Sequence, residues 1–339
     1  MKKNIGLVFI GTSRYADFFP RWYEAVSSNL LNDCEKTIFA FSDRVEEDMF
    51  KKDDVVRTII PHHRWPFVTL LRFKFIKASL EEMKKRKIDD VLFLDADLFP
   101  LEKIDYDTIF GDGTKPIVGV QHPGNFENPE WNAFIVEGDS NANILKSGEY
   151  GISYLNDKLY HQGCLWGGEL SVVEKMINEL ELMIDGDSNR NMCADWHDES
   201  HMNCWFLKNY DLIRTLPCNF AWPDQHHWHK VLTAAGLTPM MLHVDKPHSE
   251  FPRFMGGKPD ISQDSMETVI ENLNAHHIQI PFMCASCRIV ETRELDFTVL
   301  QEWSISIDGA GTGNPKNNFC ICESCLIRLK QEEAKEKEQ

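Results

Sequence analysis

Apolar residues recur with two different spacings in the first hundred residues of the chain. Short continuous apolar runs, which are typical of buried β-strands, lie at residues 5–10, 37–41, 55–60 and 91–94. Residues 18–31 and 69–85 instead place apolar side chains three and four positions apart, which predicts amphipathic helices. Strands that alternate with helices usually form a mostly parallel sheet covered on both faces. The pattern therefore predicts an α/β fold.

The pattern becomes irregular after residue 117, where Gly, Pro, His and Trp are frequent. In this part we expect a strand at 117–120 and helices at 170–183 and 200–207. The Gly-Gly-Lys-Pro sequence at 256–259 is typical of a domain boundary. The sequence thus predicts a main domain over residues 1–258, a small cysteine-rich extension over 259–329 and a charged tail over 330–339.

The amino-acid composition limits the classes of partner that the protein is expected to bind. With 36 basic and 53 acidic residues the net charge is −17, which disfavours a nucleic acid partner. A phosphate-bearing substrate would need a metal cation between it and such a protein. No apolar run approaches the roughly 18 residues of a membrane span, and residues 1–12 lack a signal-peptide cleavage site. Five scattered cysteines fit reduced thiols. We expect a soluble, unprocessed cytoplasmic protein without a membrane span.

Asp95 and Asp97 directly follow the predicted strand at 91–94. Ligands of open α/β sheets bind at the carboxyl ends of the strands. An Asp-x-Asp pair there can hold Mg²⁺ or Mn²⁺ against the phosphates of a nucleotide. Asp-x-Asp is also common in strand-end turns, so the residues alone leave both interpretations open.

A second cluster of polar residues reads Trp-His-Asp-Glu-Ser-His-Met-Asn over residues 196–203. The spacing of His197 and His201 suits one face of a helix, but a zinc protease would place Glu, not Asp198, directly after the first His. A helix start capped by a serine is one alternative. Carbohydrate chemistry by Asp198 or Glu199, with Trp196 as a stacking surface, is another. The nearby Gly-Cys-Leu-Trp-Gly-Gly segment at 163–168 indicates a tight buried turn or close backbone approach to a ligand.

These segments together resemble glycosyltransferase family 6, the retaining enzymes that include the histo-blood-group A and B transferases and the α-1,3-galactosyltransferases. The octapeptide at 196–203 differs from the family's sequence at one position, Met for Leu. Residues 65–76, 95–97, 122–124 and 160–168 resemble further family segments in the same order. The resemblance covers roughly residues 4–255.

The resemblance implies a GT-A fold, with a Rossmann-like, mostly parallel sheet flanked by helices, in a catalytic domain over residues 1–258. It also implies a retaining hexosyltransferase that moves galactose or N-acetylgalactosamine from UDP to the 3-hydroxyl of a galactose-terminated glycan in an α-1,3 linkage. Manganese or magnesium would bind Asp95 and Asp97. Glu199 would be catalytic, either as the nucleophile of a double displacement or as an electrostatic stabiliser of an oxocarbenium ion.

The family's remaining positions are carried over residue by residue. The implied donor-binding residues are Phe9, Ile10, Tyr15, Arg72, Asp95, Ala96, Asp97, Gln162, Cys164, Asp198, Lys246 and Arg253. The implied acceptor-binding residues are His122, Trp196, Asp224 and Glu199.

Some positions depart from the family pattern. Animal members carry a membrane anchor and stem, whereas this chain starts at the first strand, as soluble bacterial members do. Many bacterial members have Asn-x-Asn and work without metal; this chain keeps Asp95 and Asp97, which predicts metal dependence. Cys164 replaces a Gly or Ala that helps choose the donor sugar, and its larger side chain favours galactose.

The cysteines near the end lie outside the resemblance. Cys284-x2-Cys287 and Cys322-x2-Cys325 have the spacing of a four-cysteine structural zinc site, which predicts a zinc-ribbon-like extension. A disulfide or free thiols are the alternatives, and Cys320 could substitute for Cys322.

Two other function classes remain open at this point. A glycoside hydrolase would use paired carboxylates but has no need of Asp95-x-Asp97. A glycan-binding or zinc-based interaction protein without turnover would tolerate loss of Glu199, which this chain retains.

Overall fold

The computed structural model describes residues 2–63, 66–127, 139–155, 157–190, 192–224 and 226–244, together with four short strands beyond residue 278. The chain divides into two compact units. The first comprises Met1–His63, Phe67–Ile184 and Ala194–Lys246. The second comprises Arg64–Pro66, Asp185–Cys193 and Pro247–Gln339.

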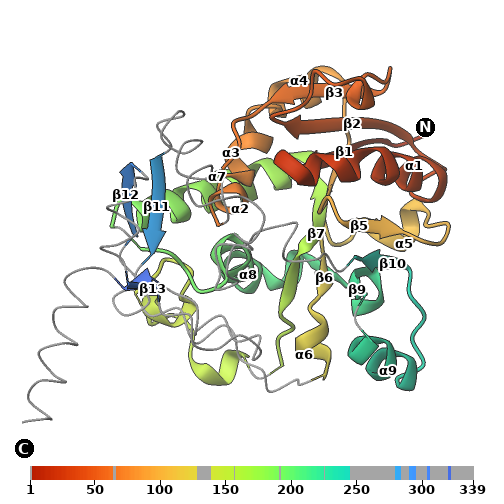
Figure 1. Cartoon of the computed structure of the whole chain (residues 1–339). Helices are drawn as coiled ribbons and strands as arrows, with labels where there is room; N and C mark the ends of the chain where they lie inside the picture. The colour runs from red at the N-terminus through yellow and green to blue at the C-terminus, as the bar shows by residue number, and fades with distance from the viewer. Residues whose placement is uncertain are drawn as a thin grey trace, which may run out of the picture. The chain divides into compact units, whose positions relative to one another are not determined.

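A seven-stranded sheet in the order β3-β2-β1-β4-β7-β6-β8 is the centre of the first unit (Figure 1). Its strands are β1 (Asn4–Ile10), β2 (Glu35–Ser42), β3 (Val55–Ile59), β4 (Asp90–Leu94), β6 (Ile117–Gln121), β7 (His161–Glu169) and β8 (Ile213–Leu216). All neighbouring pairs are parallel except those of β7, which runs antiparallel to β4 and β6. The predicted α/β fold with a mostly parallel sheet is confirmed, and its arrangement fits a GT-A fold.

The helices pack on the sheet through regularly spaced apolar residues. Helix α1 (Phe19–Asn29) buries Phe19, Trp22 and Val26, one helical face, against the core beneath β1. Helix α7 (Leu170–Ser188) buries Val173, Met176, Ile177 and Leu180. Figure 1 shows α1 in front of the sheet and α7 behind it.

The remaining elements are short. The helix expected over 69–85 is divided into α2 (Phe67–Leu70), α3 (Arg72–Lys77) and α4 (Leu80–Lys85). The helix expected at 200–207 is longer, α8 (His197–Lys208). The others are η1 (Ser13–Phe18), η2 (Asp48–Phe50), α5 (Tyr106–Phe110), α6 (Pro123–Glu127), η4 (Ile144–Ser147), η5 (Ile152–Leu155), η6 (Tyr210–Leu212), η7 (Cys218–Ala221) and α9 (His226–Ala234).

The sequence analysis did not predict β7, the strand that carries the Gly-Cys-Leu-Trp-Gly-Gly segment. Its glycines let neighbouring strands approach closely, because a Cβ on Gly167 would lie 2.0 Å from the Val91 carbonyl oxygen and one on Gly168 would lie 2.0 Å from that of Pro116. The glycines therefore serve a strand in the middle of the sheet and not the tight turn expected at 163–168.

A small second sheet brings distant parts of the chain to the end of β4. In it β10 (Met241–His243) lies between β5 (Leu98–Pro100), to which it is antiparallel, and β9 (Trp222–Pro223), to which it is parallel. Figure 1 shows these strands below α1. Beyond residue 278, β11 (Gln279–Met283) pairs with β12 (Val290–Glu294) and β13 (Ser304–Ile305) with β14 (Cys320–Ile321), both antiparallel.

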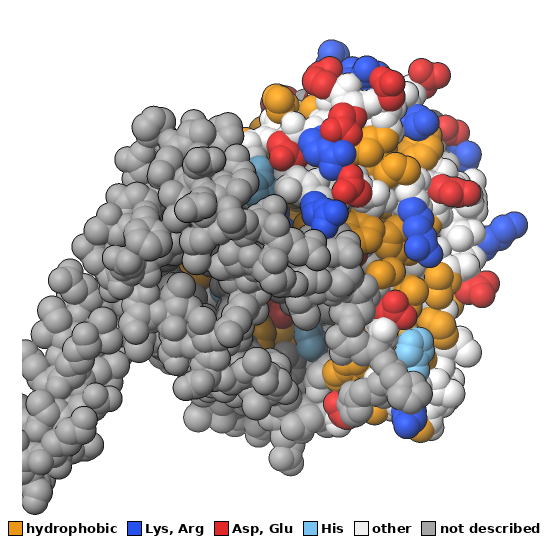
Figure 2. All heavy atoms as spheres, in the orientation of Figure 1, with side chains coloured by type: hydrophobic (Ala, Val, Ile, Leu, Met, Phe, Trp, Pro, Cys, Tyr) orange, Lys and Arg blue, Asp and Glu red, His pale blue; other side chains and the backbone are white. Residues whose placement is uncertain are grey.

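Three features bear on earlier expectations. Among the described residues, no helix is both long and apolar enough to cross a bilayer. On the described face in Figure 2, lysine and arginine side chains are interspersed with acidic ones. The described residues form ion pairs such as Lys84–Glu174 and Arg86–Glu82. The predicted zinc ligands Cys284, Cys287, Cys322 and Cys325 lie outside the described residues.

Candidate active site

Asp95, Ala96 and Asp97 lie at the carboxyl end of β4, as the sequence predicted. The Asp95 N–H donates to the Cys164 carbonyl of β7 at 2.9 Å, and Ala96 is buried. The Asp95 side chain is 27% exposed, whereas that of Asp97 is 2% exposed. One carboxylate thus reaches open space while the other is held in the protein.

His243 is a member of this site that the sequence analysis missed. The pairing of β10 with β5 sets His243 opposite Leu98, so its Nε2 lies 3.3 Å from the Asp97 Oδ1. One ligand atom each from Asp95, Asp97 and His243 all lie within 4.8 Å of one another. No motif surrounds His243 in the sequence, and only the pairing of two short strands brings it here. Carboxylate oxygens with an imidazole nitrogen suit a divalent cation such as Mn²⁺, so these residues could hold one.

Arg72, at the start of α3, connects the metal-type carboxylates to α8. Its Nε lies 3.0 Å from the Asp198 Oδ2, its Nη2 3.5 Å from the Asp95 Oδ1, and its Nη1 donates to the Gly163 carbonyl at 2.8 Å. The guanidinium also lies 4.6 Å from the centre of the Phe93 ring. Arg72 is 7% exposed, and its rigid, planar group suits several fixed hydrogen bonds at once.

Glu199 lies in the first turn of α8, next to Asp198. Its Oε2 accepts a hydrogen bond from the Gly163 N–H of β7 at 2.7 Å. Burial raises the pKa of Glu199 to about 7, although the Gly163 N–H opposes this rise. At neutral pH this carboxyl group is therefore near the midpoint of its titration.

Asn203, the last residue of the octapeptide, fixes α8 to β7. Its Oδ1 accepts from the His161 N–H at 2.8 Å, and its Nδ2 donates to the His161 carbonyl at 2.8 Å and to the Glu199 carbonyl at 2.9 Å. The Ser200 hydroxyl accepts from the Trp196 N–H at 2.9 Å. The octapeptide is thus a helix start in which Ser200 bonds back to Trp196 from inside the first turn, and the carbohydrate chemistry of Asp198 or Glu199 stays a prediction.

Gln162 and Cys164 occupy neighbouring positions on β7 but have different surroundings. Gln162 Nε2 lies 3.3 Å from His243 Nδ1, and its Oε1 is buried without a hydrogen-bond partner among the described residues. Cys164 is 1% exposed within the main core, and burial raises the pKa of its thiol well above the usual value. The Cys164 thiol is therefore protonated and packs as a small apolar group.

The predicted acceptor residues lie around the same edge of the sheet. The Nδ1 of His122 accepts from the Gly124 N–H at 2.9 Å, and burial, followed by the charge of His243, lowers the pKa of His122 to about 4. Trp196 is half-buried and packs against a cluster that includes Tyr160. The Asp224 N–H donates to the His243 carbonyl at 3.0 Å, and its side chain is 41% exposed.

The predicted donor-binding residues at and after the end of β1 differ in how much of their side chains is exposed. The Phe9 ring is fully buried, 5.0 Å from the ring of Phe19 and 5.1 Å from that of Trp22. Only its backbone is left to face a ligand. Ile10 and Tyr15 are half-buried and retain exposed side-chain surface.

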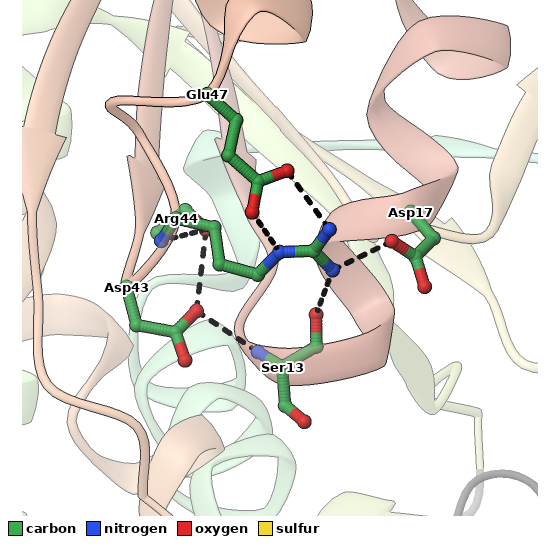
Figure 3. Close-up of polar contacts among 6 residues, drawn as sticks. Ser13, Asp17, Asp43, Arg44 and Glu47 are labelled. Atoms are coloured by element: carbon green, nitrogen blue, oxygen red, sulfur yellow. Dashed lines mark hydrogen bonds and ion pairs between the residues drawn. The ribbon is translucent and has the colours of Figure 1, made fainter.

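Arg44 fixes the loop between Ile10 and Tyr15 (Figure 3), and no motif in the sequence indicates this role. Its Nε and Nη2 donate to both oxygens of Glu47, at 2.7 and 2.8 Å, and its Nη1 donates to the Asp17 carboxylate at 2.6 Å and to the Ser13 carbonyl at 3.1 Å. The Ser13 N–H donates to Asp43 at 2.9 Å, and Ser13 has a positive φ of 52°. The loops after β1 and β2 are thus fixed to each other.

Two of the predicted donor residues, Lys246 and Arg253, lie outside the described residues. The structure brings together Arg72, Asp95, Asp97, Gln162, Asp198 and Glu199 through the contacts described above.

Comparison with known proteins gives the same assignment as the motifs. The sequence profile of glycosyltransferase family 6 matches residues 2–241, more than half of the chain. The O-antigen biosynthesis glycosyltransferase WbnI of Escherichia coli is 25% identical over 224 residues, which are 66% of this chain and 89% of the relative. The globoside alpha-1,3-N-acetylgalactosaminyltransferase 1 of Gallus gallus is 23% identical over 66% of this chain, and the histo-blood group ABO system transferase 2 of Rattus norvegicus 21% over 66%. The matches span 62% and 64% of these two animal relatives, less than two thirds of their length.

Proposed function

Because the chain belongs to glycosyltransferase family 6, we propose that it is a metal-dependent, retaining α-1,3-hexosyltransferase. It moves galactose or N-acetylgalactosamine from a UDP-sugar to the 3-hydroxyl of a galactose-terminated glycan. The observation that carries the proposal is the Arg72 bridge between Asp95 and Asp198, beside a Glu199 whose pKa is about 7. The α-1,3 linkage in the name of the Gallus gallus relative supports the proposed bond.

The metal would be held by Asp95 and Asp97, and its positive charge would stabilise the leaving UDP. Arg72 orients both Asp95 and Asp198, so the phosphate and sugar parts of the donor are positioned by one rigid group. Asp198 accepts hydrogen bonds from the hydroxyls of the donor sugar. The half-exposed Tyr15 and Ile10 face the uridine.

Glu199 is the residue through which the transfer retains the configuration of the anomeric carbon. The Gly163 N–H holds one carboxylate oxygen, which fixes the direction of the side chain. Its ionised form either attacks the anomeric carbon or stabilises positive charge there; both roles require the proton to be absent. His122, Trp196 and Asp224 receive the acceptor, with Trp196 as the apolar surface for a sugar ring.

UDP release tests the proposal. UDP-galactose and UDP-N-acetylgalactosamine are supplied with lactose, with and without Mn²⁺. We expect Mn²⁺-dependent release by the wild type and at least about 10²-fold slower release by Glu199→Gln and Asp97→Asn. Glu24→Gln, on the exposed face of α1, is the matched control and should match the wild type. Release without Mn²⁺ that survives both substitutions would contradict the proposal.

We also propose a structural zinc ion bound by Cys284, Cys287, Cys322 and Cys325, on the basis of their spacing. Metal analysis of the purified chain should find one zinc per chain, and none in a variant with Cys284→Ser and Cys325→Ser. Unchanged zinc content in that variant would contradict the assignment.

A further inference from the structure

We propose that His243 is the third protein ligand of the divalent metal and that Gln162 fixes the tautomer in which its Nε2 binds the ion. The inference rests on the proposed metal-dependent function, and deepens it by assigning a ligand outside the Asp95-x-Asp97 motif.

The backbone holds His243 on both sides. Its carbonyl accepts from the Asp224 N–H at 3.0 Å, and the N–H of the next residue, Val244, donates to the Asp97 carbonyl at 3.0 Å. The side chain is 20% exposed, and its Nε2 is directed at Asp97. A histidine fixed in this way is preorganised beside the motif.

The spacing of the ligand atoms fits a single ion. In an octahedral site with bonds of about 2.1 Å, neighbouring ligand atoms lie about 3 Å apart and opposite ones about 4.2 Å. One ligand atom each from Asp95, Asp97 and His243 lie within 4.8 Å of one another. Small side-chain movements would therefore bring all three into contact with one ion. The remaining positions would be left to phosphate oxygens and water.

The surroundings of Gln162 indicate how the Nε2 lone pair of His243 becomes available to bind the metal. If Gln162 Nε2 donates to His243 Nδ1, a neutral imidazole carries its proton on Nε2, which faces Asp97. Turning the amide by half a rotation would place Oε1, now buried and unpartnered among the described residues, against Nδ1. The oxygen would then accept from Nδ1–H, which leaves the Nε2 lone pair for the metal. Gln162 is therefore a positioning residue that can serve both tautomers.

The ligand set also predicts a metal preference. Imidazole nitrogen binds Mn²⁺ and Co²⁺ better than Mg²⁺, which prefers oxygen ligands and retains its waters. We expect the wild type to bind Mn²⁺ more tightly than Mg²⁺, with a ratio that falls at least about fivefold in His243→Gln.

Electron paramagnetic resonance of bound Mn²⁺, with UDP present, tests the ligand directly. The wild type should show nitrogen-14 modulation of the electron spin echo, and His243→Gln should lose it and bind Mn²⁺ at least about tenfold more weakly. Gln162→Leu should retain the nitrogen signal but weaken Mn²⁺ binding about tenfold. Gln162→Glu, whose carboxylate can accept from Nδ1–H, should restore the wild-type affinity for Mn²⁺. His229→Gln, on α9, is the matched control and should leave both readouts unchanged.

The outcomes separate this inference from the proposed function. Mn²⁺ binding that needs Asp97 but shows no nitrogen signal, with His243→Gln equal to the wild type, overturns the role of His243 and leaves the transferase intact. Equal affinity of the wild type and Gln162→Leu overturns the role of Gln162. If the wild type binds no Mn²⁺ with or without UDP, the metal-dependent function fails as well.

Discussion

At the scale of single residues, Arg72 connects the parts of the site. It contacts Asp95, Asp198 and the Gly163 carbonyl, so one guanidinium positions the carboxylate proposed to bind the metal, the carboxylate proposed to bind the sugar and the strand that holds Glu199. Arginine can form these bonds at fixed angles, whereas the single ammonium of lysine cannot.

Arg72→Lys should therefore reduce kcat/KM about 10²-fold while the protein remains folded. The charge is kept, but the Asp95 and Asp198 carboxylates lose their common orientation. Steady-state kinetics with a thermal melt of the same sample would measure both effects. Arg86→Lys, an exposed pair with Glu82, is the control. Wild-type activity in Arg72→Lys would show that charge alone is sufficient.

The raised pKa of Glu199 predicts that activity rises with pH while the stability of the fold falls. Because burial raises its pKa to about 7 in the free protein, kcat/KM should rise with pH through an apparent midpoint near 7. The raised folded-state pKa also means that stability from Glu199 is fully present below its unfolded pKa and is lost as pH rises through 7. The free energy of unfolding of Glu199→Gln should therefore exceed that of the wild type by about 1–3 kcal/mol at pH 8 and equal it at pH 4. Denaturant unfolding at both pH values checks this, and an equal difference at both would contradict it.

At the scale of secondary-structure elements, the edge where β4, β7 and α8 meet forms the site. The apolar runs predicted the strands at 5–10, 37–41, 55–60, 91–94 and 117–120, which the structure confirms as β1, β2, β3, β4 and β6. Strand β7 was missed because its glycines resemble a turn in sequence, and only its two neighbours explain them. His243 was missed because the pairing of β10 with β5 is a long-range contact that leaves no local pattern.

The close approach of β7 to β4 predicts that Gly167→Ala severely destabilises the fold. The new Cβ would lie 2.0 Å from the Val91 carbonyl oxygen, a backbone atom that cannot move without disrupting the sheet. We expect a loss of more than about 4 kcal/mol in the free energy of unfolding, or insoluble protein. Gly151→Ala, whose Cβ would meet nothing closer than 3.8 Å, is the control for expression and melting temperature. Similar stability of both variants would contradict the packing argument.

The Arg44 contacts predict an effect on donor binding. Arg44→Gln removes the ion pairs with Glu47 and Asp17, and so releases the loop that bears Tyr15. The KM for the UDP-sugar should rise severalfold with little change in kcat, because in the proposed function Tyr15 contacts the uridine and not the reacting atoms. Arg57→Gln, a partly exposed pair with Glu46, should leave KM unchanged. A fall in kcat at constant KM would contradict the assigned role.

At the scale of the whole molecule, the predicted fold, the motif order and the family membership agree over residues 2–241. The net charge of −17 makes a bound cation the natural intermediary for a diphosphate substrate. Relatives at 20–25% identity differ too much from this chain to identify its donor sugar or its acceptor.

The anomeric configuration of the product decides whether the protein is a retaining transferase. UDP-galactose or UDP-N-acetylgalactosamine is incubated with lactose, the protein and Mn²⁺, and the product is analysed by NMR. We predict that the transferred sugar is α-linked to the 3-hydroxyl of the acceptor galactose, with at least about 10²-fold slower formation of product by Glu199→Gln. A β-linked product would contradict the retaining role of Glu199, and no transfer or UDP release from either donor would contradict the transferase assignment.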